Sequence, residues 1–231
     1  MQKAVIGQKA PLLSVSDWLQ GTPTNFDQLS GRVVLVVVFQ VNCPGCFLYS
    51  LPQAIELQQR YAGQGLTVLG VATAFEDFDK NNLENLIRLV EKGEVVGETL
   101  RLLSLKGKLQ NRRLRYRINF PVAMDKLNKR LGANIENDID AFIRLRLPDF
   151  QDKARREQQR IREQLQDYFQ ALEYQADTFE CFGLQGTPSY ILVDKRGLLK
   201  ACRFGAYPEL EADIQKLLQE QTPDEPETGG E

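Results

Sequence analysis

Two cysteines separated by two residues are the group in this sequence with the clearest chemistry. Cys43 and Cys46 end the stretch VVLVVVFQVNCPGC, which begins at Val33. Residues 33–39 are apolar and mostly β-branched, which predicts a strand buried on both faces in the middle of an α/β sheet. Apolar residues at helical spacing follow Cys46 and continue almost to Gly65. The pair is therefore expected where a central strand is followed by a helix.

This position favours disulfide exchange, because the thiolate is the nucleophile in that reaction. A helix N-terminus stabilises negative charge, so the pKa of Cys43 should lie below that of a free thiol. Pro44 suits the first helical turn, where its missing N–H would have no partner. Cys46 would lie close enough to attack a mixed disulfide on Cys43. A nucleophile with a resolving thiol is the favoured interpretation; two buried structural cysteines and half of a zinc site are the alternatives.

Four stretches of the chain resemble the redoxin branch of the thioredoxin superfamily, which includes TlpA-like proteins and the alkyl hydroperoxide reductase/thiol-specific antioxidant family. They are residues 7–11, 29–32, 43–46 and 186–194. The resemblance covers both ends of the chain and leaves the middle uncovered. It implies a thioredoxin-like α/β fold, with a central mixed sheet flanked by helices, and a redox-active Cys43–Cys46 disulfide.

The same resemblance assigns a role to Thr187 and Pro188. Base rates alone predict a trans peptide bond before a proline. In relatives, however, the matching proline is cis and lies beside the cysteines, and the backbone of the residue before it binds the substrate as an added strand. Thr187 and Pro188 are therefore the expected substrate-binding residues.

The chain is expected to form one thioredoxin-like domain over residues 1–221, followed by an acidic, disordered tail at 222–231. Residues 66–72 predict a second buried strand, parallel to the first. Residues 10–30 predict a small hairpin. Residues 120–125 resemble the edge strand that follows the crossover helix in relatives.

An extended crossover is expected over residues 77–119. Residues 81–90 have helical spacing, and a second helical stretch is predicted to about Arg113. A cluster of basic residues follows, for which the solvated end of a helix is the expected explanation. The cluster consists of Arg112, Arg113, Arg115 and Arg117.

A helical insertion is expected over residues 126–178, before the cis-proline segment. Residues 128–147 have a helical pattern, which Pro148 interrupts. A long charged helix is predicted over residues 149–179, with one apolar stripe that faces either the core or a partner. The insertion is therefore a possible partner surface.

Three positions depart from the patterns of relatives. Val37 stands where thioredoxins carry a buried acid, and Tyr49 stands where cytochrome-maturation relatives carry a glutamate. Asn42 replaces the aromatic residue that often precedes the first cysteine. No obvious internal base therefore remains for the resolving thiol. Either exchange is expected to be slower, or a carboxylate from the insertion serves as the base. Pro52 lies in the helix after the cysteines and should bend it.

Composition excludes several classes of function. The chain has 231 residues, 29 Lys and Arg, 31 Asp and Glu, and no histidine. A net charge of −2 gives no general attraction to nucleic acid or to anionic membranes. Without histidine there is no Cys-His or Ser-His-Asp catalysis and no histidine-ligated metal or haem, and neither a cofactor nor a metal is predicted. No signal peptide and no stretch of transmembrane length is visible, so a cytoplasmic location is expected, where a Cys-x-x-Cys is more often catalytic than structural.

The other two cysteines are Cys181 and Cys202. They are expected to serve as small buried apolar residues. A four-cysteine metal site with Cys43 and Cys46 is a weaker alternative, because a second close pair is missing. A third alternative is that one of them relays a disulfide from the active site.

Three functions follow from these features. The favoured one is a thiol–disulfide oxidoreductase whose partners are a protein thiol or disulfide and a thiol reductant or oxidant. A thiol-dependent peroxidase is an alternative, although Gln40 stands where that class places a threonine or serine, three residues before the reactive cysteine. The third is a non-catalytic binding or scaffold protein that uses the insertion, for which a fully active Cys43→Ser variant would be the sign.

Overall fold

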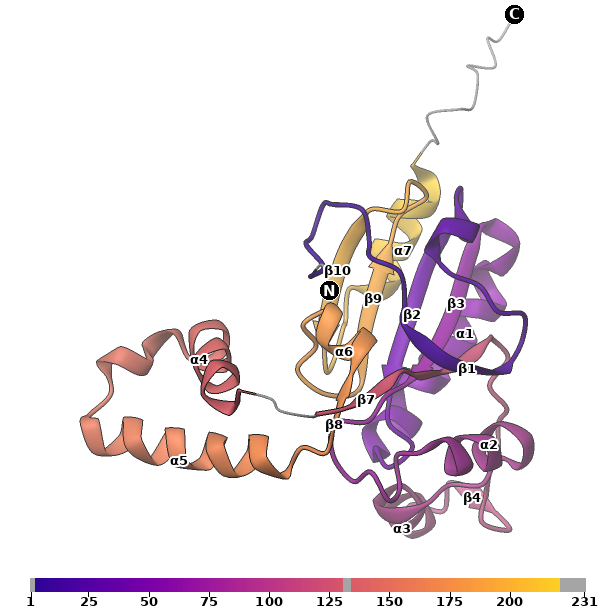
Figure 1. The fold of residues 1–231 in the computed structure, drawn as a ribbon. Coiled ribbons are helices and arrows are strands. Elements are labelled where there is room, and N and C mark those ends of the chain that lie inside the picture. Colours follow the sequence, from indigo (N-terminus) through magenta and orange to yellow (C-terminus); the bar gives the residue numbers. More distant parts are fainter. Residues whose placement is uncertain (1–2, 131–133, 221–231) are drawn as a thin grey trace, which may run out of the picture. The chain divides into compact units, whose positions relative to one another are not determined.

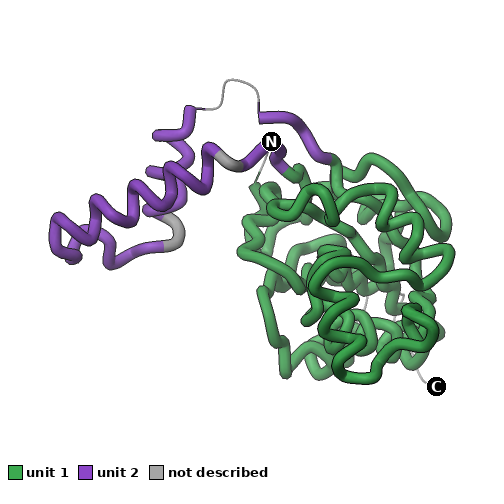
Figure 2. Tube along the Cα trace, turned by 90° about the horizontal axis from the view of Figure 1, so that it is seen from below, with its two compact units in different colours: residues 1–126, 176–231 green, residues 127–175 purple. Residues whose placement is uncertain are grey.

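The computed structural model describes residues 3–130 and 134–220, and the tail predicted at 222–231 lies outside them. The chain divides into two compact units (Figure 2). The first comprises residues 1–126 and 176–231, and the second residues 127–175. Within the described residues, no helix is both long and apolar enough to cross a membrane.

A six-stranded mixed sheet forms the core of the first unit (Figure 1). Its strands, in spatial order, are β1 (Val15–Gln20), β6 (Val122–Asp125), β3 (Leu66–Ala72), β2 (Val33–Phe39), β9 (Ser189–Val193) and β10 (Leu199–Phe204). Every residue of β2 is buried, and β2 pairs parallel with β3 and antiparallel with β9. The predictions of a central strand at 33–39 and of a parallel strand at 66–72 are confirmed.

The hairpin predicted in residues 10–30 is wrong, because β1 pairs with β6 from far along the chain. Gly21, just after β1, has a φ of +76°, and a Cβ there would lie 2.8 Å from Pro121 Cγ. Only glycine therefore allows β1 to approach the start of β6 this closely. Since β1 covers β6, residues 120–125 contain a strand, as predicted, but that strand is not at the edge of the sheet.

The described part of the first unit contains five α-helices. They are α1 (Leu51–Tyr61), α2 (Leu83–Lys92), α3 (Gly97–Leu105), α6 (Asp177–Cys181) and α7 (Leu210–Gln219). Tyr61 Oη donates a hydrogen bond of 2.6 Å to Glu211 and accepts one of 2.6 Å from Gln215, so α1 and α7 lie side by side. Figure 1 shows these two helices behind the sheet and α6 in front of it.

The second helix of the crossover is shorter than predicted. It ends at Leu105, and a hairpin of β4 (Leu109–Gln110) and β5 (Arg113–Leu114) follows. Gly107, just beyond α3, has a φ of +62°, which is the left-handed conformation that commonly ends a helix. The arginine cluster therefore lies on this hairpin and on the irregular segment after it, and not at a helix end as predicted.

The second unit is a helical hairpin with a short ladder at its base. Its elements are β7 (Leu127–Lys129), α4 (Ile135–Arg146), a 3-10 turn (Pro148–Asp152), α5 (Arg155–Ala171) and β8 (Tyr174–Ala176), with β7 paired to β8. The prediction of a helix beginning at 128 is wrong because β7 occupies that stretch. On α5, the stripe residues Ile161, Leu165 and Phe169 pack against a cluster that includes Ile139 and Ile143 of α4. These three stripe residues therefore pack inside the insertion.

The long helix predicted over 149–179 is interrupted, because the chain must rejoin the sheet. Asp125, at the end of β6, accepts hydrogen bonds from Thr178 N (2.8 Å), Phe179 N (3.1 Å) and Thr73 Oγ1 (2.8 Å). Because this fully buried carboxylate accepts hydrogen bonds from N–H groups in the first turn of α6, α6 begins here as a separate helix. Phe179, the last residue of the predicted stripe, then stacks on Phe75 at a centroid distance of 4.7 Å.

Asp125 should also make stability depend on pH. Burial raises its pKa from 3.8 to about 6, although the three hydrogen bonds oppose the change. The native state therefore holds this proton more tightly than the unfolded state. The contribution of Asp125 to the free energy of unfolding is complete below about pH 4 and is lost as the pH rises through about 6. The full difference corresponds to roughly 3 kcal/mol. Urea unfolding between these pH values should show the slope, and Asp125→Asn should flatten it; an equal slope in both proteins would contradict the assignment.

Candidate active site

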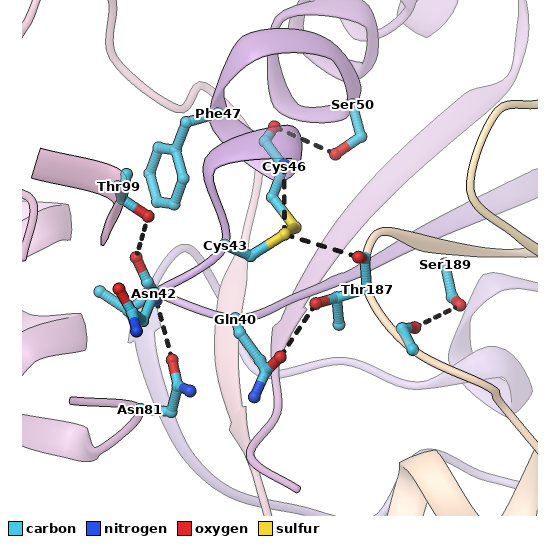
Figure 3. Close-up of a disulfide and its surroundings, with 12 residues drawn as sticks. Gln40, Asn42, Cys43, Cys46, Phe47, Ser50, Asn81, Thr99, Thr187 and Ser189 are labelled. Carbon is cyan, nitrogen blue, oxygen red and sulfur yellow. Dashed lines mark hydrogen bonds between the residues drawn. A yellow bond between two sulfur atoms is a disulfide. The ribbon is translucent and has the colours of Figure 1, made fainter. Parts of the chain in front are cut away.

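Cys43 and Cys46 form a disulfide at the end of the sheet where β2 ends (Figure 3). The helix begins at Pro44, so Cys43 precedes its first turn as predicted. The backbone N–H of Cys46 donates to the carbonyl oxygen of Cys43 (3.0 Å) and also lies 3.3 Å from its Sγ. Cys43 is half-buried, whereas Cys46 is fully buried. Cys43 is therefore the more exposed of the two cysteines.

The helix after the cysteines starts with a widened turn. Residues Cys46–Ser50 form a π-helical segment, in which the N–H of Leu51 donates to the carbonyl of Cys46. Ser50 Oγ donates to the same carbonyl at 3.1 Å. Pro52 follows at once and has no N–H to continue an α-helical ladder. The irregularity that Pro52 predicts thus takes the form of a π-turn beside the disulfide.

The predicted substrate-binding residues lie against the disulfide. The Thr187–Pro188 peptide bond is cis, as the resemblance implied. The carbonyl oxygen of Thr187 is 3.6 Å from Cys43 Sγ, which can donate to it only when reduced to the thiol. A Cβ on Gly45 would lie 3.9 Å from Pro188 Cδ. The structure thus brings together the four residues that the sequence selected.

Gln40 is a site residue whose role sequence reasoning missed. Its side chain is 2% exposed. Thr187 Oγ1 donates to Gln40 Oε1 at 3.1 Å (Figure 3). Gln40 Nε2 donates to the carbonyl of Glu76 at 3.5 Å. The amide therefore joins the cis-proline loop to the loop after β3. A polar residue directly after seven buried apolar ones was the available signal, because a buried amide needs partners.

Asn42 is the second missed residue, and it connects the crossover to the site. Its backbone N–H donates to Asn81 Oδ1 (2.8 Å), and its Nδ2 donates to Asp77 Oδ2 (2.7 Å). Its Oδ1 accepts from the backbone N–H of Glu98 at 2.7 Å. Thr99 Oγ1 donates to the carbonyl of Val41 at 3.0 Å. These hydrogen bonds therefore hold the crossover against the two residues that precede Cys43.

Neither Val37 nor Tyr49, which stand where relatives carry an acid, supplies a base. Val37 is fully buried among apolar residues, and Tyr49 is 69% exposed. Glu76, on the loop that binds Gln40, has a pKa raised by burial and by the neighbouring Asp77. This loop follows β3 and does not belong to the insertion, from which a carboxylate was expected.

Cys181 is buried and Cys202 is partly buried. Burial raises the pKa of both thiols, to about 12 for Cys202, so neither is activated as a nucleophile. Within the residues that the structure describes, no cluster of three or more Cys, Asp or Glu side chains could hold a metal ion. The relay role considered for these cysteines stays a prediction.

No protein-family model matches the chain, and no curated protein matches it in sequence. Solved structures do. A thioredoxin-like superfamily protein is 23% identical with a TM-score of 0.57, and the alignment covers 93% of this chain and 99% of that one. A thiol-disulfide isomerase from Corynebacterium glutamicum is 25% identical with a TM-score of 0.56, over 91% of this chain and 97% of that one.

These likenesses extend over nearly the whole length of both relatives. The Cys43–Cys46 pair and the similarity to a thiol-disulfide isomerase together support a redox function. The chain therefore has the thioredoxin-like fold.

Proposed function

We propose that this chain is a thiol–disulfide oxidoreductase in which Cys43 exchanges with the substrate and Cys46 resolves. The observation that carries the proposal is the unequal burial of a disulfide at a helix N-terminus, with Cys43 half-buried and Cys46 fully buried. The helix N-terminus favours the Cys43 thiolate over the thiol.

The reduced protein would act in two exchange steps. The Cys43 thiolate attacks one sulfur of a substrate disulfide, and the other substrate sulfur leaves as a thiolate. The Cys46 thiolate then attacks Cys43 Sγ, which closes the Cys43–Cys46 disulfide and expels the second substrate thiolate. Two electrons pass to the substrate, and the two protons of the cysteine thiols end on its two sulfurs. Oxidation of a substrate dithiol is the same sequence in reverse.

Thr187 and Pro188 are proposed to hold the substrate backbone as an added strand next to Cys43. The 3.6 Å separation between the Thr187 carbonyl and Cys43 Sγ supports this role. Gln40 would hold that carbonyl in place through the Thr187 hydroxyl. The proposed partners are a protein thiol or disulfide and a thiol reductant or oxidant in the cytoplasm, with the insertion as a further partner surface.

The test is a redox titration of the Cys43–Cys46 pair in glutathione buffers, read by thiol alkylation and mass. We expect a reversible two-electron transition between about −120 and −270 mV, the range of catalytic pairs in this superfamily. A pair that forms no disulfide at any potential would overturn the proposal. The same preparation should not consume hydrogen peroxide with a thioredoxin-type reductant; rapid consumption would favour the thiol peroxidase instead.

A further inference from the structure

One segment of the crossover carries only positive charge. Residues 99–124, which we call the basic segment, contain no Asp or Glu. Their seven cations are Arg101, Lys106, Lys108, Arg112, Arg113, Arg115 and Arg117. The whole chain has a net charge of −2. The positive charge of the basic segment is therefore balanced by acidic residues that lie elsewhere in the sequence.

The charge of the basic segment is presented to solvent and largely uncompensated. All seven side chains belong to exposed residues. Arg101 pairs with Glu98 at 2.7 Å, and Arg113 pairs with Glu94 at 3.3 Å. Among the residues that the structure describes, the other five cations form no ion pair. Their mutual repulsion does not help folding, so the basic segment has the electrostatic character of a binding surface.

The tip of the β4–β5 hairpin places an arginine where folding favours glycine. Gln110 pairs with Arg113, so the loop between them has two residues, Asn111 and Arg112. Their φ values are +50° and +62°. Two-residue loops of this kind prefer Asn-Gly, because glycine adopts the left-handed conformation without strain. An exposed arginine in a strained conformation is typical of a residue kept for binding and not for stability.

Two residues of the basic segment are hydrogen-bonded to backbone carbonyls close to the cysteines. Thr99 donates to the carbonyl of Val41, two residues before Cys43. Tyr116 Oη donates at 2.9 Å to the carbonyl of Phe47, the residue after Cys46. Figure 1 shows α3 and β4 at the end of the sheet where β2 ends. A macromolecule that reaches Cys43 would therefore meet this positive charge.

We infer that the basic segment is the docking surface for an acidic polypeptide that exchanges disulfides with Cys43. The inference rests on the proposed oxidoreductase function and adds the class of its partner. A polypeptide is favoured over a nucleic acid because the basic segment borders a disulfide. Only a partner that carries a thiol or a disulfide can bind the basic segment and also exchange with Cys43. Charges at the rim of an interface act mainly on the association rate, and salt screens them.

The experiment compares two cysteine-containing peptides of equal length, one flanked by glutamates and one by lysines. The full-length oxidised protein is mixed with each peptide, and release of the Cys46 thiol is followed by stopped flow at low and high NaCl. Each rate is divided by the rate of the same peptide with neutral hydroxyethyl disulfide, which removes the effect of the flanking charges on thiol reactivity. At low salt the acidic peptide should react about tenfold faster than the basic one, and high salt should remove the difference.

A matched pair of variants assigns the effect to the basic segment. Lys108→Gln with Arg112→Gly removes two of its charges, and the second change should raise the melting temperature because it relieves the left-handed arginine. Lys9→Gln with Lys216→Gln removes the same amount of charge outside the basic segment. Lys9 donates to the carbonyl of Arg196, and Lys216 lies in the last turn of α7. The first variant should lose most of the preference for the acidic peptide while remaining folded, and the second should keep it.

The outcomes separate the inference from the proposed function. Equal rates with both peptides, or a preference that high salt leaves unchanged, would overturn the docking surface while leaving the oxidoreductase intact. No reaction with either peptide would overturn the proposed function. A thiol-free single-stranded RNA should not compete with the acidic peptide at equal charge; if it displaces the peptide and binds more tightly, the surface is a nucleic-acid site and the inference is wrong.

Discussion

Replacing Cys46 with serine is expected to turn this chain into a trap for its substrates. Cys43 keeps its half-buried position at the helix N-terminus and can still attack a disulfide. The fully buried resolving sulfur is gone, however, so the mixed disulfide can be released only by an external thiol. Because the intramolecular step has a large effective concentration, the adduct should persist at least about a hundredfold longer than in the wild type. Non-reducing electrophoresis and intact mass after mixing with an oxidised peptide would measure this.

Three further serine variants serve as controls for the trap. Cys43→Ser should form no adduct, because Cys46 has no access to the substrate. Cys181→Ser and Cys202→Ser should exchange like the wild type, since burial raises the pKa of both thiols. An adduct in Cys43→Ser would show that the roles of Cys43 and Cys46 are reversed.

Gly97→Ala should destabilise the fold and slow exchange at Cys43 together. Gly97 has a φ of +53°, and a Cβ there would lie 2.2 Å from Asn42 Oδ1. Alanine must therefore adopt the left-handed conformation and also displace Asn42, which holds α3 and the loop at Asp77. We expect a loss of about 4 kcal/mol in the free energy of unfolding, from backbone strain and lost hydrogen bonds. Urea unfolding and the peptide exchange rate would measure both effects.

Gly107→Ala is the matched control for Gly97→Ala. Gly107 has a similar φ of +62°, but a Cβ there would meet no atom within 4 Å. Only the strain of the left-handed conformation remains, so the loss should be about 1–2 kcal/mol and the exchange rate should not change. If the two variants lose equal stability and exchange at equal rates, the contact between Gly97 and Asn42 does not position the site.

The sequence alone determined the centre of the molecule. A strand made of a continuous apolar run is stable only where both faces of the sheet are covered. Residues 33–39 therefore predicted β2, and residues 66–72 predicted β3. The position of the Cys-x-x-Cys pair, between the central strand and the helix, followed from its place directly after that strand. The cis form of Pro188 came from resemblance, because the local chain carries no physical signal strong enough to overcome the trans preference.

Only the tertiary structure decided which distant segments meet. The apolar spacing across 149–179 is regular, yet α5 contacts α4 while Phe179 stacks on Phe75, because Asp125 captures the chain where it returns to the sheet. The contacts of Gln40 and Asn42 with Thr187 and Glu98 likewise join residues far apart in sequence. Periodicity reports which face of an element is apolar, but the partner that covers the face, or that satisfies a buried amide, is chosen by packing of the whole chain.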